Sequence, residues 1–489
     1  MNSGSSSKQL YRLPELCRLE AIELARMIRA REVSVVEVIT AYLDHIERVN
    51  PLVNAIVSLR PRRDLLEEAV AADVAVSRGE KVGPLLGVPQ AIKDLANTKG
   101  LRTTYGSPLF RDFIPDNDAI FVSRMRAAGA IIIGKTNTPE LGLGSNSYNP
   151  IFGTTLNPYD PTRIGGGSSG GAAVSLAMRM LPVADGSDMG GSLRNPAAFN
   201  NVIGFRVSAG RVPALALDAF SSQMTVVGPM GRTVEDVAKL LSVQAGYDDR
   251  VPQSLDSPSG WLDNLKPIDP RKARFGWLGD WTRQLAFEPG LVDLVRGAAG
   301  KFAQAGARVD DISSGFDLER LWNIYVTLRS DALAGQLHDA YNDPSLRDLI
   351  KPEAMWEVEQ GRTLSTHDLY TARLARTEWY LKMVSLFERY DYLLLPSAQV
   401  FPFDASIRWP KEINGRTMDT YHRWMQVVIG PTLASLPSIG IPAGFDQRGL
   451  PMGMQIVGRP RGDRSVLEAA LLYEQLNPWN KHLPPCLHL

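Results

Sequence analysis

Residues 163–199 read RIGGGSSGGAAVSLAMRMLPVADGSDMGGSLRNPAAF, the longest tract of the chain that is rich in glycine and serine. Such a tract can be a flexible linker. Two features favour a folded site instead. The first glycines give way to an apolar run, AAVSLAM at 172–178, and a second glycine turn at 186–191 follows another apolar piece at 181–184. Because glycine serves where a backbone takes positive φ or lies close to another group, two such turns around a buried helix predict a scaffold whose N–H groups face a bound molecule.

Composition and charge exclude several function classes. The chain has 489 residues, of which 44% are hydrophobic and 22% charged, which is typical of a globular enzyme. Lys+Arg and Asp+Glu both number 53, so the formal net charge is zero and we expect neither a nucleic-acid nor a membrane partner. Cys17 and Cys486, the two cysteines, lie in no CxxC motif, so neither a disulfide framework nor a zinc site is predicted.

The chain also lacks the patterns of export or membrane insertion. No stretch approaches the roughly 18 consecutive apolar residues of a membrane span. Residues 1–8 are polar and lack the apolar region of a signal peptide. With two unpaired cysteines, this predicts a cytoplasmic protein.

Short apolar runs that alternate with helical patterns predict the fold class. SVVE at 34–37 is a capping box that opens a helix, which Asn50-Pro51 is expected to end, and further helices are expected at 64–77, 119–128 and 234–245. Apolar runs bounded by turn residues predict strands at 85–95, 130–134, 183–185, 202–205, 392–395, 438–441 and 452–457. Strands that alternate with helices predict an α/β fold, a mixed sheet covered by helices on both faces.

Two segments further along the chain have a different character. Residues 252–269 are rich in Pro, Ser, Asp and Gly and predict a surface loop. Residues 285–430 are mainly helical in pattern and carry many aromatic side chains. We expect most of these aromatics to pack helices together, while one or two are candidates for lining a substrate pocket.

Two familiar motifs fail on physical grounds. GAIIIGKT at 129–136 matches the P-loop pattern, but AIII is typical of a buried strand, whose N–H groups are not free for phosphate. GGSSG at 166–170 matches the nucleophile elbow, but it follows turn residues at 157–163 rather than a strand. None of the six histidines lies in a setting that suggests a catalytic base. We therefore expect neither nucleotide binding nor a Ser-His-Asp triad.

A lysine offers another base for a serine nucleophile. Burial disfavours the charged ammonium and lowers the pKa of lysine, which makes the neutral amine available. LLGVPQAIKDL at 85–95 places Lys93 inside an otherwise apolar strand. On this stretch alone, Lys93 can equally be a strand-end cation paired with Asp94.

The combination of three strings decides between these two interpretations of Lys93. GVPQAIKD at 87–94, GGSSGG at 166–171 and GSDMGGSLR at 186–194 resemble the amidase signature family of serine hydrolases in order and spacing. Further matching strings lie at 128–140, which explains the false P-loop, and at 228–236 and 449–455. The resemblance spans about residues 20–480.

The resemblance implies one amidase domain over residues 1–489 with a central mixed, twisted β-sheet covered by helices on both faces. Within it we expect four parts. They are an N-terminal helical segment at 1–70, a signature core at 71–250 that carries the catalytic residues, a variable helical pocket region at 285–430, and a return to the core at 431–489.

The resemblance also assigns roles to residues. Ser192 is the nucleophile, Lys93 the base, and Ser168 the serine between them, which this family holds by a cis peptide bond. The N–H groups of Met189, Gly190 and Gly191, with that of Ser192, form the oxyanion hole. No metal or organic cofactor is implied.

Three residues are assigned supporting roles: Ser169, Asp188 and Arg194. Asp188 and Arg194 either brace the glycine loop or form an ordinary turn ion pair. The chain also departs from the family pattern. Met189 stands where Thr, Ser or Ile is common, Asn200-Asn201 where Cys-Gly is common, and Arg206-Val207 where Lys-Pro or Arg-Pro is common. The backbone N–H at 189 survives its substitution, so these departures concern packing and not chemistry.

Three functions remain open on the sequence. The first is a stand-alone hydrolase, monomer or homodimer, that cleaves a C–N bond of a small amide, anilide or carbamate (urethane). The second is a glutaminase-like A subunit of a tRNA-dependent amidotransferase, against which Asn195 counts because such subunits usually carry Gln there. The third is a catalytically inactive binding protein, against which the intact Lys93, Ser168 and Ser192 argue.

Overall fold

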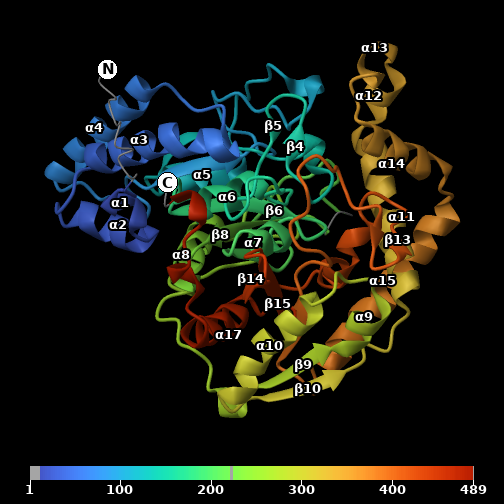
Figure 1. Ribbon diagram of the computed structural model, residues 1–489. Coiled ribbons are helices and arrows are strands. Elements are labelled where there is room, and N and C mark those ends of the chain that lie inside the picture. Colours follow the sequence, from blue (N-terminus) through green and yellow to red (C-terminus); the bar gives the residue numbers. More distant parts are fainter. Residues whose placement is uncertain (1–11, 221–223, 488–489) are drawn as a thin grey trace, which may run out of the picture.

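The computed structural model describes residues 12–220 and 224–487 (Figure 1); the polar residues 1–8 lie outside this part. Its largest element is an eight-stranded sheet. The strand order is β10 (Arg308–Ile312), β9 (Arg274–Leu278), β11 (Tyr392–Pro396), β15 (Pro451–Val457), β14 (Ser438–Phe445), β7 (Ile203–Arg206), β8 (Val226–Gly231) and β6 (Val183–Asp188). The first three strands run parallel and the other pairs antiparallel, so the sheet is mixed.

A smaller sheet lies beside the end of the large one. Its order is β1 (Ile56–Val57), β3 (Ile131–Thr136) and β2 (Pro89–Lys93). Gln90 on β2 donates through Nε2 to Val183 O on β6 at 3.1 Å, which joins the two sheets. Two short pairs complete the strands: β4 (Tyr148–Asn149) with β5 (Gly153–Thr154), and β12 (Glu412–Ile413) with β13 (Arg416–Thr417).

Helices cover the sheets. In Figure 1, α7 (Arg194–Phe199) lies on one side of β14 and β15, and α10 (Leu291–Gln304) and α17 (Asp463–Leu476) lie on the other. The N-terminal half of the chain adds α1 (Glu15–Arg18), α2 (Ala21–Arg29), α3 (Val35–Val53), α4 (Arg62–Ser77), α5 (Ile120–Ala127), α6 (Gly170–Ala177) and α8 (Val234–Gln244). The remaining helices are α9 (Gly279–Gln284), α11 (Leu318–Gln336), α12 (His338–Asn342), α13 (Pro344–Arg347), α14 (Pro352–Thr363), α15 (Thr366–Leu386) and α16 (Ile429–Leu433). The predicted α/β fold is confirmed.

Most predicted elements are present. Each of the seven predicted strand ranges overlaps a strand, and the capping box of α3 forms, with Ser34 Oγ accepting from the Glu37 N–H at 3.1 Å. The segment predicted as a loop at 252–269 has no helix or strand of its own. Within the residues that the structure describes, no helix combines the length and the apolar character needed to cross a membrane.

The predicted end of the first long helix at Asn50-Pro51 is wrong. α3 continues through Pro51 to Val53, and Asn54 follows in the left-handed region at φ 51°. Proline lacks an N–H and its ring crowds the carbonyl four residues earlier, but at position 51 both effects fall in the last turn of the helix. Asn50 Oδ1 then accepts the N–H groups of Ala55 and Ile56 at 2.9 and 2.8 Å, so the chain after the helix is satisfied.

Three strands of the large sheet, β8, β9 and β10, were not predicted. The strand predicted at 85–95 is shorter, because residues 85–88 form a turn before β2, with Gly87 at φ 70°. β8 contains Gly228 and Pro229, which usually interrupt strands. A Cβ at Gly228 would clash with Phe205 O, so glycine allows this close approach of neighbouring strands. β9 and β10 lie within or beside the segment predicted as mainly helical, and β10, at the sheet edge, has the polar sequence RVDDI.

Candidate active site

Lys93 ends β2 with its side chain buried inside the protein. Its Nζ lies 2.7 Å from Ser168 Oγ, 2.8 Å from Ser169 Oγ and 3.0 Å from Ser187 Oγ. The Asp94 carboxylate instead accepts from the N–H and hydroxyl of Thr104. The alternative of a strand-end ion pair with Asp94 is therefore wrong, and the amine faces three hydroxyl groups.

The surroundings of Lys93 favour the neutral amine. Burial lowers the pKa of Lys93 to about 7, although Asp185 and Asp188 act in the opposite direction. Asp185 itself accepts the Lys93 backbone N–H at 3.2 Å, which fixes the end of β2 against β6. A neutral amine has two N–H donors and one lone pair, so it can donate to two hydroxyls and accept a proton from the third.

The first glycine string positions Ser168 and Ser169 at the start of α6. The Gly167–Ser168 peptide bond is cis, as the resemblance implies. A Cβ at Gly167 would lie 2.9 Å from the backbone nitrogen of Asn146, so only glycine permits this approach. The string is thus buried in the protein and is not a linker.

The second glycine string carries Ser192 between β6 and α7. The Ser169 N–H donates to Ser192 O at 3.1 Å, which brings the two strings together. Ser192 is buried, with 8% of its surface exposed. Within residues 12–220 and 224–487, Ser192 Oγ makes no hydrogen bond. Lys93 and Ser168 are therefore in direct side-chain contact, and Ser192 is connected to them through the backbone hydrogen bond to Ser169. A hydrogen bond between the hydroxyls of Ser168 and Ser192 stays a prediction.

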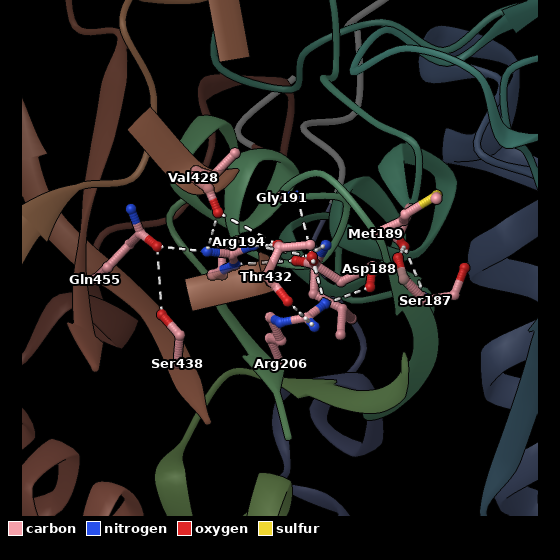
Figure 2. A network of polar contacts seen from close by, with 12 residues as sticks. Ser187, Asp188, Met189, Gly191, Arg194, Arg206, Val428, Thr432, Ser438 and Gln455 are labelled. Atoms are coloured by element: carbon pink, nitrogen blue, oxygen red, sulfur yellow. Dashed lines mark hydrogen bonds and ion pairs between the residues drawn. The ribbon is translucent and has the colours of Figure 1, made fainter. Parts of the chain in front are cut away.

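Asp188 holds the loop that carries Ser192 (Figure 2). Its two carboxylate oxygens accept the N–H groups of Gly191 and Leu193 at 3.0 and 3.1 Å and two N–H groups of Arg194 at 2.9 and 3.0 Å. Burial alone would raise the pKa of Asp188, but Arg194 and Arg206 hold it well below its ordinary value. The Asp188–Arg194 pair therefore braces the loop rather than closing an ordinary surface turn.

Arg194 ties this loop to the C-terminal part of the chain. Its Nη1 donates to Val428 O at 2.9 Å and to Gln455 Oε1 at 2.6 Å, and its Nη2 donates to Thr432 Oγ1 at 3.1 Å (Figure 2). Gln455 lies on β15, in a string that the resemblance includes. The site thus depends on residues more than 230 positions apart in the sequence.

One expected oxyanion donor already has a partner. Gly191, at φ 88°, points its N–H at Asp188 Oδ1, so this N–H must be shared or released to bind a substrate oxygen. The roles of Met189, Gly190 and Gly191 as oxyanion donors stay predictions.

Several residues beside the site carried no recognisable motif. Arg206 donates through Nη1 to Asp188 O at 2.6 Å, the carbonyl of the peptide group whose N–H belongs to Met189. A charged donor on a peptide carbonyl polarises that group and makes its N–H a stronger donor. Tyr325 and Arg329 on α11 also reach this loop: a Cβ at Gly190 would clash with Tyr325 Oη, and Arg329 Nη1 lies 3.4 Å from the Met189 sulfur. In the sequence, only the departure at Arg206-Val207 and the aromatic character of 285–430 pointed to these residues.

The buried histidine beside this site packs among aromatic rings. His422 stacks on Tyr421 at a centroid distance of 4.4 Å and meets the edge of Trp322 on α11 at 5.1 Å. Over the described part of the chain, no group of three or more His, Cys, Asp or Glu side chains is arranged to hold a metal ion.

Comparisons with known proteins support the family resemblance that these glycine-rich sequence motifs indicate. The sequence model of the family described as Amidase matches residues 37–467. The curated A subunit of the glutamyl-tRNA(Gln) amidotransferase of Thermosynechococcus vestitus is 32% identical over 484 residues, which cover 94% of this chain and 98% of that protein.

Two solved structures resemble the fold closely. A bacterial aryl acylamidase of the amidase signature family has a TM-score of 0.85 and 29% identity, covering 95% of this chain and 97% of that one. The A subunit of the Thermotoga maritima glutamyl-tRNA(Gln) amidotransferase has a TM-score of 0.77 and 26% identity, covering 95% and 96%. Because the family match extends over most of the sequence, the chain belongs to the amidase signature family, whose enzymes hydrolyse carbon–nitrogen bonds.

Proposed function

We propose that the protein cleaves the C–N bond of an amide, anilide or carbamate through an acyl-enzyme on Ser192, with Ser168 and Lys93 as the proton relay. The observation that carries this proposal is the 2.7 Å contact between Lys93 Nζ and Ser168 Oγ inside the protein. A buried amine of lowered pKa that contacts a serine hydroxyl can take a proton from it, so Lys93 is suited to act as the general base.

The relay is balanced in protons. Neutral Lys93 takes the Ser168 proton while Ser168 takes the Ser192 proton, and Ser192 Oγ attacks the substrate carbonyl carbon. Collapse of the tetrahedral intermediate breaks the C–N bond, and Ser168 gives a proton to the leaving nitrogen and recovers one from Lys93. Water then attacks the acyl group by the same route and regenerates Ser192.

The glycine loop supplies the electrostatic part of the proposal. Backbone N–H groups of residues 189–192 are proposed to bind the oxyanion. Losing one such donor typically costs about 2.7–4 kcal/mol in other serine hydrolases. Asp188, Arg194 and Arg206 together carry a net charge of +1 under this loop, a field that favours the developing negative charge.

The second candidate is a glutaminase-like A subunit of a tRNA-dependent amidotransferase, and one observation favours it. The sequence comparison aligns a protein of this kind nearly full-length with this chain at 32% identity, so curated relatives support this candidate better than a urethanase. The fold comparison supports the first candidate, because the TM-score is higher with the aryl acylamidase than with the Thermotoga maritima amidotransferase protein.

A substrate panel on the purified chain tests both candidates. Nitroanilides, primary amides, aryl carbamates, esters and free glutamine are compared on the wild type, on Ser192→Ala and on Ser175→Ala. Ser175 is a matched control because it is a buried serine on α6 that donates to Gly171 O at 2.7 Å, away from Lys93. Turnover of anilides or carbamates by the chain alone supports the first candidate. Turnover confined to glutamine and dependent on added partner proteins would establish the second and refute the first.

Loss of the nucleophile provides a direct test of the chemistry. A fluorophosphonate probe is expected to label the wild type and Ser175→Ala but not Ser192→Ala. A wild type that does not react with the probe would instead support a catalytically inactive binding protein.

A further inference from the structure

A buried ion pair, Arg329 with Glu357, lies beside the glycine loop. We call this pair, together with the side chains that contact it, the wall. Arg329 on α11 donates through Nε to Glu357 Oε1 on α14 at 3.0 Å, and the two side chains are 7% and 0% exposed. Arg329 Nη1 lies 3.4 Å from the sulfur of Met189, the residue that follows Asp188 in the loop. The guanidinium is therefore only one side chain away from the proposed oxyanion hole.

The donors of Arg329 are almost fully used inside the protein. Besides Glu357 and Met189, its Nη1 lies 3.3 Å from Tyr325 Oη and its Nη2 donates to Tyr421 Oη at 2.9 Å. Guanidinium has five N–H groups, so at most one is left for a ligand. A carboxylate bound in the usual bidentate way needs two.

The wall has no net charge. Glu357 offsets the charge of Arg329, and Tyr421 Oη also contacts Glu357 Oε1. Burial raises the pKa of Tyr325 and of Tyr421 and lowers that of His422 well below its ordinary value, so all three are neutral.

A second buried cation lies within electrostatic range of this ion pair and is likewise offset. Lys351, at the start of α14, donates to Leu143 O at 3.1 Å and is buried. Its electrostatic neighbours include Glu140 and Glu353, which favour its charged form, whereas burial lowers its pKa. This lysine therefore does not provide a free positive charge to a ligand.

We propose that the Arg329–Glu357 pair keeps the protein beside the glycine loop electrically neutral, so that the site selects substrates without a carboxylate near the scissile bond. The inference rests on the proposed hydrolytic function of Ser192. A carboxylate brought against this wall would lose its water and gain neither a free cation nor a pair of donors, whereas a neutral acyl or aryl group loses nothing comparable. Free glutamine carries a carboxylate, so the wall also argues against it as the substrate.

The test compares two substrates that differ by one carboxylate, butyryl 4-nitroanilide and succinyl 4-nitroanilide. The wild type is expected to hydrolyse the neutral substrate with a kcat/KM at least about tenfold higher, and equal values would overturn the inference. The two compounds are also compared as protectants of Ser192 against a fluorophosphonate, which needs no turnover. Failure of the probe to label the wild type would refute the proposed function itself.

A charge change at Glu357 gives the converse result. Glu357→Gln keeps an oxygen for Arg329 Nε and leaves the guanidinium uncompensated, so the preference is expected to shift at least about tenfold toward the succinyl substrate. Glu359→Gln, an exposed position on the same helix, is the matched control and should leave the ratio unchanged. If Glu357→Gln does not fold, as judged by circular dichroism, the wild-type ratio still decides. An unchanged ratio in a folded Glu357→Gln would refute the role of the pair.

Discussion

Lys93 is expected to titrate near neutral pH and to set the pH dependence of activity. An ordinary lysine has a pKa of 10.5, whereas burial lowers that of Lys93 to about 7. The relay needs the neutral amine, so kcat/KM is expected to rise with pH through this value and then to level off. At a pKa of about 7, roughly one tenth of the enzyme carries neutral Lys93 at pH 6 and roughly nine tenths at pH 8.

The magnitude follows from these fractions. Between pH 6 and pH 8, kcat/KM for a nitroanilide should increase about tenfold, and between pH 8 and pH 10 by less than about 1.2-fold. With an ordinary pKa, the same rate would rise about 100-fold from pH 6 to pH 8 and continue to rise to pH 10. A profile that still climbs steeply above pH 8 would therefore refute neutral Lys93 as the base.

A second buried lysine provides the control. Lys135 on β3 donates to Ala96 O at 2.6 Å and Thr98 Oγ1 at 2.9 Å, and burial lowers its pKa to about 8. Lys135→Met should keep the rise near pH 7 because this lysine contacts none of the site serines. Lys93→Met should lose amide turnover, with no pH-dependent recovery. Loss of the rise in a folded Lys135→Met would show that the titration belongs to Lys135 and not to Lys93.

Three further outcomes are expected. Ser192→Ala should lower kcat by at least about 10⁴-fold, and a smaller loss at unchanged folding would show another nucleophile. Gly190→Ala should lower kcat by about 10²-fold because its Cβ clashes with Tyr325 Oη; adding Tyr325→Phe should recover part of this loss, and no recovery would contradict the clash. Asp188→Asn removes the counter-charge of two buried arginines and should lower the free energy of unfolding in urea by about 3–5 kcal/mol; a loss below about 1 kcal/mol would show that Asp188 does not brace the loop.

The glycine strings explain why the centre of the site could be predicted from the sequence. Gly167 lies where a Cβ would approach a backbone nitrogen, and Gly191 has a positive φ, so at both positions the backbone geometry dictates the residue type. Because these constraints act on neighbouring positions, they produce short sequence motifs that can be recognised in the sequence. Lys93 could not be assigned from its strand alone, because a strand-end cation paired with Asp94 explained it equally well; the resemblance of the three strings to the amidase signature family decided between the two interpretations.

The wall formed by α11 and α14 could not be predicted in this way. Arg329 and Glu357 are 28 positions apart and belong to different helices, and nothing in either helix pattern pairs them. Their contact depends on how the helices pack, which is a tertiary property. β8 was also missed. Gly228 and Pro229 are poor strand formers, so the local sequence does not predict a strand there, but pairing with the neighbouring strands accommodates them.

The arrangement around Lys93 would let a buried amine change its charge during the proposed reaction. In the neutral form, the two N–H groups can point at Ser169 and Ser187 while the lone pair faces the Ser168 hydroxyl. In the proposed relay Lys93 then takes a proton, the ammonium has three donors, and the same three hydroxyls lie within 3.0 Å to accept them. Neither form leaves an N–H without an acceptor, so the proton can arrive and leave with small movements. A pocket lined by apolar groups would lower the pKa of the lysine equally well. It would, however, leave the N–H groups of the ammonium without acceptors, which would make protonation of the lysine during the relay unfavourable.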